Sequence, residues 1–237
     1  DIYKTQLPLV LTLYPERGCD IINAILTAMD HHGKFPTAYL LQRKDLGAFD
    51  SQASGLAHYV LADAFARKLQ GIDWRRAKEL MAQSLSSDRG QQFIAEGRVL
   101  PLSHTLDLAG AAFATALVAQ GLGDQPLYER MMELSGNWRN AFDPETALLS
   151  RESWYYEGTL WNYSFRLLHD MAGRIALCGG DEAFISQLDQ FFGYTDIEMG
   201  IVDPHPAPGA FQKIIRDDRF EGLNNESDME TPYAYIY

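Results

Sequence analysis

Segments with apolar residues at the spacing of an α-helix follow one another along this chain, and several of them end at a glycine. Ile21, Ile25 and Met29 share one helical face, and Gly33 then offers the left-handed conformation that ends a helix. The stretch from Gly55 to Leu69 is apolar nearly all round, as in a helix buried on several sides. The pattern predicts a mainly α-helical chain.

The same spacing predicts further helices, joined by short links. They are expected over Asp73 to Leu85, Thr105 to Gly121, Asp124 to Phe142, Ser164 to Leu177 and Asp181 to Phe192. Asp73 has the right side chain and position to cap the first of these. Repeated helical hairpins indicate an α-helical toroid or solenoid, and the lack of a fixed sequence period argues against a regular repeat array.

Two regions interrupt the helical pattern. Residues 143–160 hold a turn signal, a short extended segment and many aromatic residues, and they predict a short β or irregular excursion. Residues 193–219 include Pro204, Pro206 and Pro208, which predict a long loop. A final helix is expected near Asp228.

Composition excludes some partners. The formal net charge of −12 over 237 residues argues against a nucleic-acid partner, which requires clustered Lys and Arg. No apolar run is expected to span a bilayer. Cys19 and Cys178 could pair or stay reduced. The chain starts at Asp1 without a signal peptide and both ends look cut, so we expect it to be part of a longer protein.

The strongest chemical signal is Glu157 in an aromatic cluster. Its neighbours are Trp154, Tyr155, Tyr156, Trp161 and Tyr163. A carboxyl group held against apolar rings has its ionised form disfavoured, which raises the pKa toward that of a general acid. Aromatic rings also suit the apolar faces of sugars. The alternative is an exposed glutamate in a loop beside core aromatics.

A second group of oxygen donors lies near the end of the chain. Asn224, Asn225 and Glu226 suit a hard cation such as Ca²⁺ or a polyhydroxylated ligand, although asparagine-rich loops are more often plain turns. Asp217 and Asp218 are adjacent and are interpreted as a solvated loop pair.

The histidines give weaker evidence for a catalytic or metal site than these two groups. His58 and His169 have apolar neighbours at helical spacing, which is typical of core histidines, and His31 and His32 fall at a helix end, where they favour the macrodipole. No two histidines have zinc-site spacing with a third ligand, and neither a nucleophile elbow nor a phosphate loop is present.

Several stretches together resemble glycoside hydrolase family 92, the calcium-dependent exo-acting α-mannosidases. "EGTLWNYSFRLLHDMAGRIALCGGDEAFISQLDQFF" is similar to the family's stretch around its general acid, and "SHTLDLA" and "WRNAFDPETALL" are similar to two further elements. "GLNNESDMETPYAY" resembles a G-N-E/Q-P segment, and "DIYKTQLPLVLTLYPER" resembles the family's opening. The resemblance covers essentially the whole chain.

The resemblance implies a fold and a site. The fold is an all-α (α/α)6 barrel, of which residues 1–237 would be a fragment of the single catalytic domain, with a β-sandwich domain before it and the remaining barrel helices after it. Glu157 corresponds to the general acid. Asn225 and Glu226 belong to the segment that helps bind Ca²⁺ and the terminal sugar, while Asp1 and Trp161 are expected on the substrate side.

The implied activity is that of an inverting exo-α-mannosidase that removes terminal mannose from glycans. The general base would be an Asp beyond Tyr237, so the isolated fragment is expected to be inactive. Because Glu226 is the one strong carboxylate of its segment, the fragment alone is expected to bind Ca²⁺ weakly. The expected partners are a glycan and the remainder of the same chain, and the expected location is secreted or periplasmic.

Some positions depart from the family pattern. Thr159 replaces an Asn after the acid, and Ser227 replaces a Pro. His104 and Asp107 replace Arg and Glu, and Gly110, Ala111 and Ala112 stand where the family has an acidic pair. These departures leave open an alternative from another class, a catalytically silent glycan-binding or scaffold protein on the same fold.

Overall fold

The computed structural model forms two compact units, Asp1–Asn140 (unit 1) and Ala141–Tyr237 (unit 2), which are described separately. It describes residues 3–35, 38–39, 48–49, 53, 55–86, 88–153, 159–195 and 229–237.

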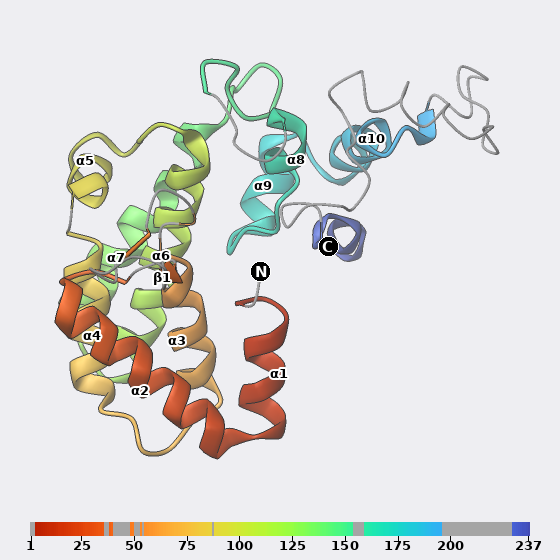
Figure 1. Cartoon of the computed structure of the whole chain (residues 1–237). Helices are drawn as coiled ribbons and strands as arrows, with labels where there is room; N and C mark the ends of the chain where they lie inside the picture. Colours follow the sequence, from red (N-terminus) through yellow and green to blue (C-terminus); the bar gives the residue numbers. More distant parts are fainter. Residues whose placement is uncertain are drawn as a thin grey trace. The chain divides into compact units, whose positions relative to one another are not determined.

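Unit 1 is built mainly of helices. Its elements are α1 (Gln6–Leu13), α2 (Pro15–His32), β1 (Ala38–Tyr39), β2 (Ala48–Phe49), α3 (Leu56–Ala66), α4 (Trp74–Ser84), α5 (Asp88–Glu96), α6 (Leu102–Gly121), α7 (Gln125–Ser135) and the 3-10 helix η1 (Gly136–Ala141). Figure 1 shows α3, α6 and α7 lying alongside one another. The prediction of a mainly helical chain is confirmed.

Local signals set the helix ends as predicted. Gly33 ends α2 with φ +75°, and its N–H donates to the carbonyl oxygen of Met29. Asp73 caps α4 by accepting a hydrogen bond of 3.0 Å from the N–H of Arg76. The buried stripe of α2 is made by Ile22, Leu26 and Met29, so its centre lies beside the predicted face.

Helix α6 is the centre of unit 1 and packs against α3, α4, α5 and α7. Small residues allow the close approach of α3. A Cβ added to Gly110 would lie 1.5 Å from the hydroxyl oxygen of Tyr59, and one added to Gly121 would lie 2.4 Å from the ring of Phe65. Larger side chains at these glycines would therefore push the two helices apart.

The length and apolar composition of α6 are sufficient for it to cross a membrane, which the sequence expectation did not foresee. In the structure, 89% of that segment is buried inside the protein. The apolar surface of α6 is thus satisfied by its neighbours in unit 1, as in the core helix of a globular domain.

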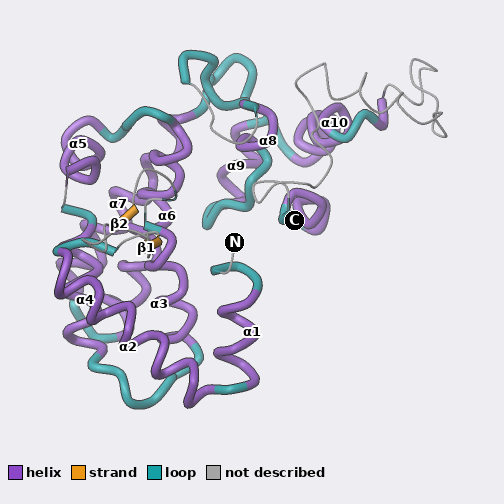
Figure 2. Tube along the Cα trace, in the orientation of Figure 1, coloured by secondary structure: helices purple, strands orange, loops and turns teal. Residues whose placement is uncertain are grey.

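Four elements of unit 1 were not predicted. Helix α1 contains Pro8, which is tolerated because it falls in the first turn, and α5 is a short helix of nine residues. Strands β1 and β2 pair antiparallel, with Ala38 opposite Phe49 and Tyr39 opposite Ala48. Figure 2 shows how small this ribbon is beside the helices.

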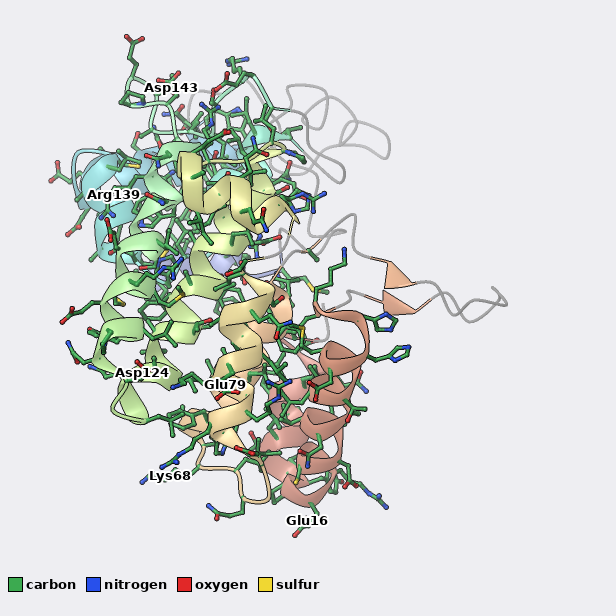
Figure 3. All side chains as sticks on the ribbon, turned by 90° about the vertical axis from the view of Figure 1, so that its left-hand side faces the viewer. Glu16, Lys68, Glu79, Asp124, Arg139 and Asp143 are labelled. Carbon is green, nitrogen blue, oxygen red and sulfur yellow. The ribbon has the colours of Figure 1, made fainter. Side chains whose placement is uncertain are left out.

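Charged side chains lie mostly on the outside of unit 1, and Figure 3 shows Glu16 and Lys68 at one end of the helices. Lys78 pairs with Asp124 between α4 and the start of α7. This hydrogen bond, followed by the one from the backbone N–H of Leu127, holds the pKa of Asp124 below its usual range. Such exposed pairs contribute little to stability, so apolar burial holds unit 1 together.

Unit 2 has shorter elements: α8 (Leu160–Ser164), α9 (Met171–Leu177), α10 (Asp181–Phe191) and the 3-10 helix η2 (Thr231–Ile236). The helix predicted over Ser164 to Leu177 is wrong in its first half. Helix α9 begins only at Met171, because Asp170 caps it by accepting a hydrogen bond of 2.9 Å from the N–H of Gly173. The helix expected near Asp228 is η2.

The excursion predicted near residues 143–160 is present in the part that the structure describes. Phe142 and Leu149 form an isolated antiparallel bridge, and the N–H of Asp143 donates to the carbonyl oxygen of Leu148 at 2.8 Å. The loop predicted over residues 193–219 follows α10, but residues 196–219 lie outside the described residues.

Candidate active site

Most of the predicted site residues fall outside the described part of the chain. Glu157, Asp1, Asn225 and Glu226 all do, whereas Trp161 is described. The described residues on either side of Glu157 and after Glu226 nevertheless show how unit 2 holds the ends of these segments.

Helix α8 begins two residues after Glu157 and is started by Thr159. The Thr159 hydroxyl accepts a hydrogen bond of 3.2 Å from the N–H of Trp161, and the side-chain oxygen of Asn162 accepts one of 2.7 Å from the N–H of Thr159. This reciprocal capping box satisfies backbone groups that a helix start leaves unpaired. Thr159 departs from the family pattern, and this capping gives it a clear local role.

The indole of Trp161 is half-buried. It stacks on the ring of Phe165 with centroids 6.0 Å apart and an angle of 20° between the rings. Phe165 is itself in the apolar core of unit 2, with Phe184 and Phe191. The stacking fixes the plane of the indole, which is what an aromatic platform for a sugar requires.

The segment after Glu226 is anchored beside the end of α8. The Glu230 carboxylate accepts a hydrogen bond of 3.1 Å from the N–H of Leu167 and lies 3.8 Å from Nε of Arg166. Thr231, which follows, is fully buried. Glu230, four residues after Glu226 in the sequence, is therefore joined to the turn that follows α8.

A second tie fixes the other end of η2. The Tyr235 hydroxyl donates to the carboxylate of Asp189 on α10 at 2.6 Å, and its ring stacks on Phe192. Burial, followed by this hydrogen bond, raises the pKa of Tyr235 well above its usual range, so the hydroxyl keeps its proton and remains a donor.

A buried cation, Arg174, lies at the C-terminal end of α8. The Arg174 guanidinium is fully buried; its Nε donates to the carbonyl oxygen of Ser164 at 3.2 Å and its Nη1 donates to Sγ of Cys178 at 2.6 Å. It lies 4.7 Å from the ring centre of Phe142, 5.7 Å from that of Phe165 and 5.5 Å from that of Phe184. Burial lowers the pKa of Arg174 below its usual value.

His58 is a core histidine, as predicted. Nδ1 lies 3.0 Å from the carbonyl oxygen of Gly55, and Nε2 lies 3.0 Å from that of Met81. Burial lowers its pKa to about 4, against the opposing effect of the two carbonyl groups. His58 thus lies between α3 and α4 as a neutral ring, whose single N–H donates to one of these two carbonyl oxygens. The other histidine expected in the core, His169, lies in the half-buried turn before α9.

The departures on α6 lie in the interior of unit 1. His104, Asp107, Ala111 and Ala112 are all buried, and the Cβ of Ala111 is 2.7 Å from where a side chain at Gly55 would begin. Close packing against Tyr59 and Gly55 accounts for the small residues at 110 and 111.

Metal-binding groups are scarce in the part of the chain that the structure describes. No group of three or more His, Cys, Asp or Glu residues lies close enough to hold a metal ion there. Cys19 and Cys178 are both free thiols. Asp217, Asp218 and His205 lie outside the described residues.

Sequence reasoning missed Glu230 and Arg174. The signal for Arg174 was a single cation within the otherwise apolar run "MAGRIAL", a pattern that indicates a buried charge. Glu230 carried no comparable signal, because its partners, Arg166 and the N–H of Leu167, are more than sixty residues away in sequence.

Comparison with known proteins assigns the chain to a family. Residues 1–237 match the catalytic domain of glycosyl hydrolase family 92. No curated protein matches the chain.

Two solved structures from Bacteroides thetaiotaomicron are similar to the entire chain. An inverting mannosidase of family 92 matches with a TM-score of 0.76 and 22% identity, and an α-mannosidase of family 92 in complex with mannoimidazole matches with a TM-score of 0.75 and 21% identity. The chain spans 36% and 34% of their lengths. The likeness shows the fold, part of an (α/α)6 barrel. With the family match over all its residues, the chain belongs to the catalytic domain of glycosyl hydrolase family 92.

Proposed function

We propose that the protein containing this chain is an inverting exo-α-mannosidase that removes terminal mannose from glycans. The observation that carries the proposal is the family match over residues 1–237. It is supported by the two similar structures, one described as an inverting mannosidase and the other bound to mannoimidazole. Because the chain spans about a third of those proteins, the activity belongs to the longer protein.

Glu157 is the proposed general acid. Protonation of the leaving oxygen requires a carboxyl group that keeps its proton near neutral pH, and the aromatic neighbours in the sequence favour this by disfavouring the ionised form. An Asp outside this chain would activate the attacking water. In inverting enzymes the two carboxyl groups stand about 6.5–9.5 Å apart, which leaves room for that water.

The sugar would be held by residues from both anchored segments. Trp161 offers a fixed aromatic plane, and Asn225 and Glu226 offer an amide and a carboxylate to hydroxyl groups. Asp1 is proposed on the substrate side. The turn that receives Glu230 is the shared support, since it follows α8 directly and also fixes the start of η2.

Calcium is the proposed cofactor of the longer protein, since enzymes of this family generally depend on it. Asn225 and Glu226 are the candidate ligands, and their oxygen atoms fit a hard cation in type. They do not fit in number, because Ca²⁺ takes about six to eight oxygens. Further oxygen ligands would therefore have to complete the site.

Hydrolysis of an α-linked mannobiose by the full-length protein tests the function. Glu157→Gln removes the proton donor with little change of shape, and we expect its kcat to fall about 10²–10⁴-fold. Glu145→Gln, at an exposed glutamate of the same unit, is the matched control and should keep full activity. Near wild-type hydrolysis by the Glu157→Gln protein, or activity unaffected by chelation of calcium, would contradict the assignment.

The silent glycan-binding alternative was based on the loss of charge at His104, Asp107, Ala111 and Ala112. All four are buried in unit 1, and close packing against Gly55 explains the small size of Ala111. Their composition therefore gives no support to a loss of activity. A secreted or periplasmic location remains part of the proposal, and it is inferred from the family resemblance alone.

A further inference from the structure

We propose that Arg174 is a positioning residue for the segment that carries Glu157, acting through the C-terminal end of α8. The inference rests on the proposed function, since it assigns Arg174 a part in the geometry of the proposed general acid.

Helix α8 cannot hold its own position. It has five residues, and a helix of this length is unstable without outside contacts. The Ser164 hydroxyl accepts a hydrogen bond of 2.8 Å from the N–H of Leu149 and donates one of 2.5 Å to the carbonyl oxygen of Leu160. The Ser164 carbonyl oxygen accepts the hydrogen bond from Arg174. The hydroxyl group and the carbonyl oxygen of Ser164 thus both help to fix the helix.

Arg174 is an unusual choice for a buried support. Among the residues that the structure describes, no carboxylate contacts its guanidinium, and Nη2 has no hydrogen-bond partner. The charge is stabilised instead by the faces of three aromatic rings, each within the range of cation–π attraction.

Such an ion is a poor source of stability, because replacing a buried charge by an apolar side chain of similar volume is often neutral or stabilising. What the guanidinium supplies is direction. Its plane is set by the rings, and the rings come from the bridge residue Phe142, from Phe165 just after α8, and from Phe184 on α10. The Nε–H is thereby aimed at Ser164, and this fixes the end of α8 relative to three other parts of unit 2.

The effect reaches the acid through the helix. Ser164 is linked to Leu160, Leu160 follows the capping residue Thr159, and Thr159 is two residues after Glu157. A rotation or shift at Ser164 would therefore move Thr159, the described residue nearest to Glu157 in the sequence. Small displacements of a reacting group are costly, since about 1 Å can reduce a rate about 10²-fold.

The test compares two substrates of the full-length protein that differ in their need for an acid. Dinitrophenyl α-mannoside has a leaving group that departs without protonation, whereas α-linked mannobiose needs a proton from the acid. For Arg174→Met we expect kcat on mannobiose to fall about 10²-fold, with KM little changed and kcat on the dinitrophenyl substrate within a few-fold of wild type. Arg174→Lys should show a smaller loss in the same direction, because it keeps the charge without the planar fork.

Arg151→Met, at an exposed arginine of the same unit, is the matched control and should behave as wild type on both substrates. An equal loss on both substrates, or no loss on either, would overturn the positioning role while leaving the enzyme assignment intact. A wild-type protein that cleaves neither substrate overturns the proposed function and the positioning role with it. If a thermal melt shows that Arg174→Met does not fold, Arg174→Lys decides the question by the same comparison of substrates.

Discussion

The two units reach compact structures by different means. Unit 1 uses long helices whose apolar side chains form one core from α2, α3, α4 and α6, with glycine and alanine at the closest contacts. Unit 2 uses short helices around an aromatic core, and it buries Asn162, Ser164 and Arg174 inside it. Apolar burial is non-directional, whereas a buried hydrogen bond holds its partners at a set distance and angle. Unit 1 also buries polar side chains, but its core consists mainly of packed apolar ones, whereas in unit 2 Asn162, Ser164 and Arg174 hold a short helix by hydrogen bonds.

The polar core of unit 2 lies where the predicted site segments are attached. Its buried polar groups hold the start and the end of α8, and Glu230 is tied to the turn that follows. In unit 1, His58 lies between α3 and α4, whereas Thr105 and Thr115 form hydrogen bonds with the loop before α6 and within α6. We therefore expect core mutations in unit 1 to lower stability, and mutations of the buried polar groups in unit 2 to lower stability and also to displace α8.

The largest effect is expected from a cavity in the core of unit 1. Leu61 is fully buried on α3, and Leu61→Ala should lower the free energy of unfolding by about 2–5 kcal/mol in urea titrations of the full-length protein. Leu117→Ala, at an exposed leucine of α6, should cost only about 0.5 kcal/mol. Equal losses at the two positions would show that unit 1 does not depend on apolar packing.

The next effect is a dependence on pH that originates in unit 1. The folded pKa of His58 is about 4 and its ordinary value is 6.5, so below pH 6.5 the unfolded chain binds a proton that the folded chain does not. Stability should therefore fall by about 3 kcal/mol as the pH drops from 6.5 to 4, and the loss is absent above pH 6.5.

Unfolding curves of wild type and His58→Gln over this pH range measure that contribution. The variant is expected to lose less stability than wild type between pH 6.5 and 4, whatever its stability at neutral pH. Parallel curves for the two proteins would mean that His58 is protonated in the folded state.

The smallest effect is a difference in stability loss between two capping residues, one in each unit. Asn162 is fully buried and accepts the hydrogen bond from the N–H of Thr159, so Asn162→Ala leaves a donor unsatisfied and should cost about 1–3 kcal/mol. Asp73→Ala removes an exposed cap in unit 1 and should cost about 1 kcal/mol. A smaller loss at Asn162 than at Asp73, in the same thermal or urea assay, would contradict the importance of buried polar contacts in unit 2.

The sequence predicted elements wherever local chemistry decides the structure. Gly33 and Asp73 act on their own helices, so their roles were readable from a few neighbouring residues. The helix expected over Ser164 to Leu177 failed because its apolar spacing continues through a turn that Asp170 ends by capping α9. Helix α1 was missed because Pro8 lowers the helical signal of so short a segment.

The candidate site was less readable, because its supports are contacts between distant residues. Glu230 accepts a hydrogen bond from the N–H of Leu167, which is sixty-three positions away in sequence, and no local sequence pattern predicts such a pair. The role of Thr159 was also hidden, since the departure from the family pattern indicated a lost amide and not a gained cap. Glu157, Asn225 and Glu226 stay predictions that rest on the family resemblance.

Helix α6 is apolar enough for two environments, the interior of the folded protein and the interior of a lipid bilayer. Its most apolar 18-residue stretch has a mean hydropathy of 1.3, so by length and composition alone the segment could cross a membrane. An aspartate costs about 2.5–3.5 kcal/mol at the centre of a membrane helix, and less toward its ends. Asp107, together with His104, therefore weakens the affinity of this segment for lipid, while both side chains are accommodated inside the folded protein. These two polar residues favour the protein interior over the membrane as the final environment of the most apolar long helix described in the chain.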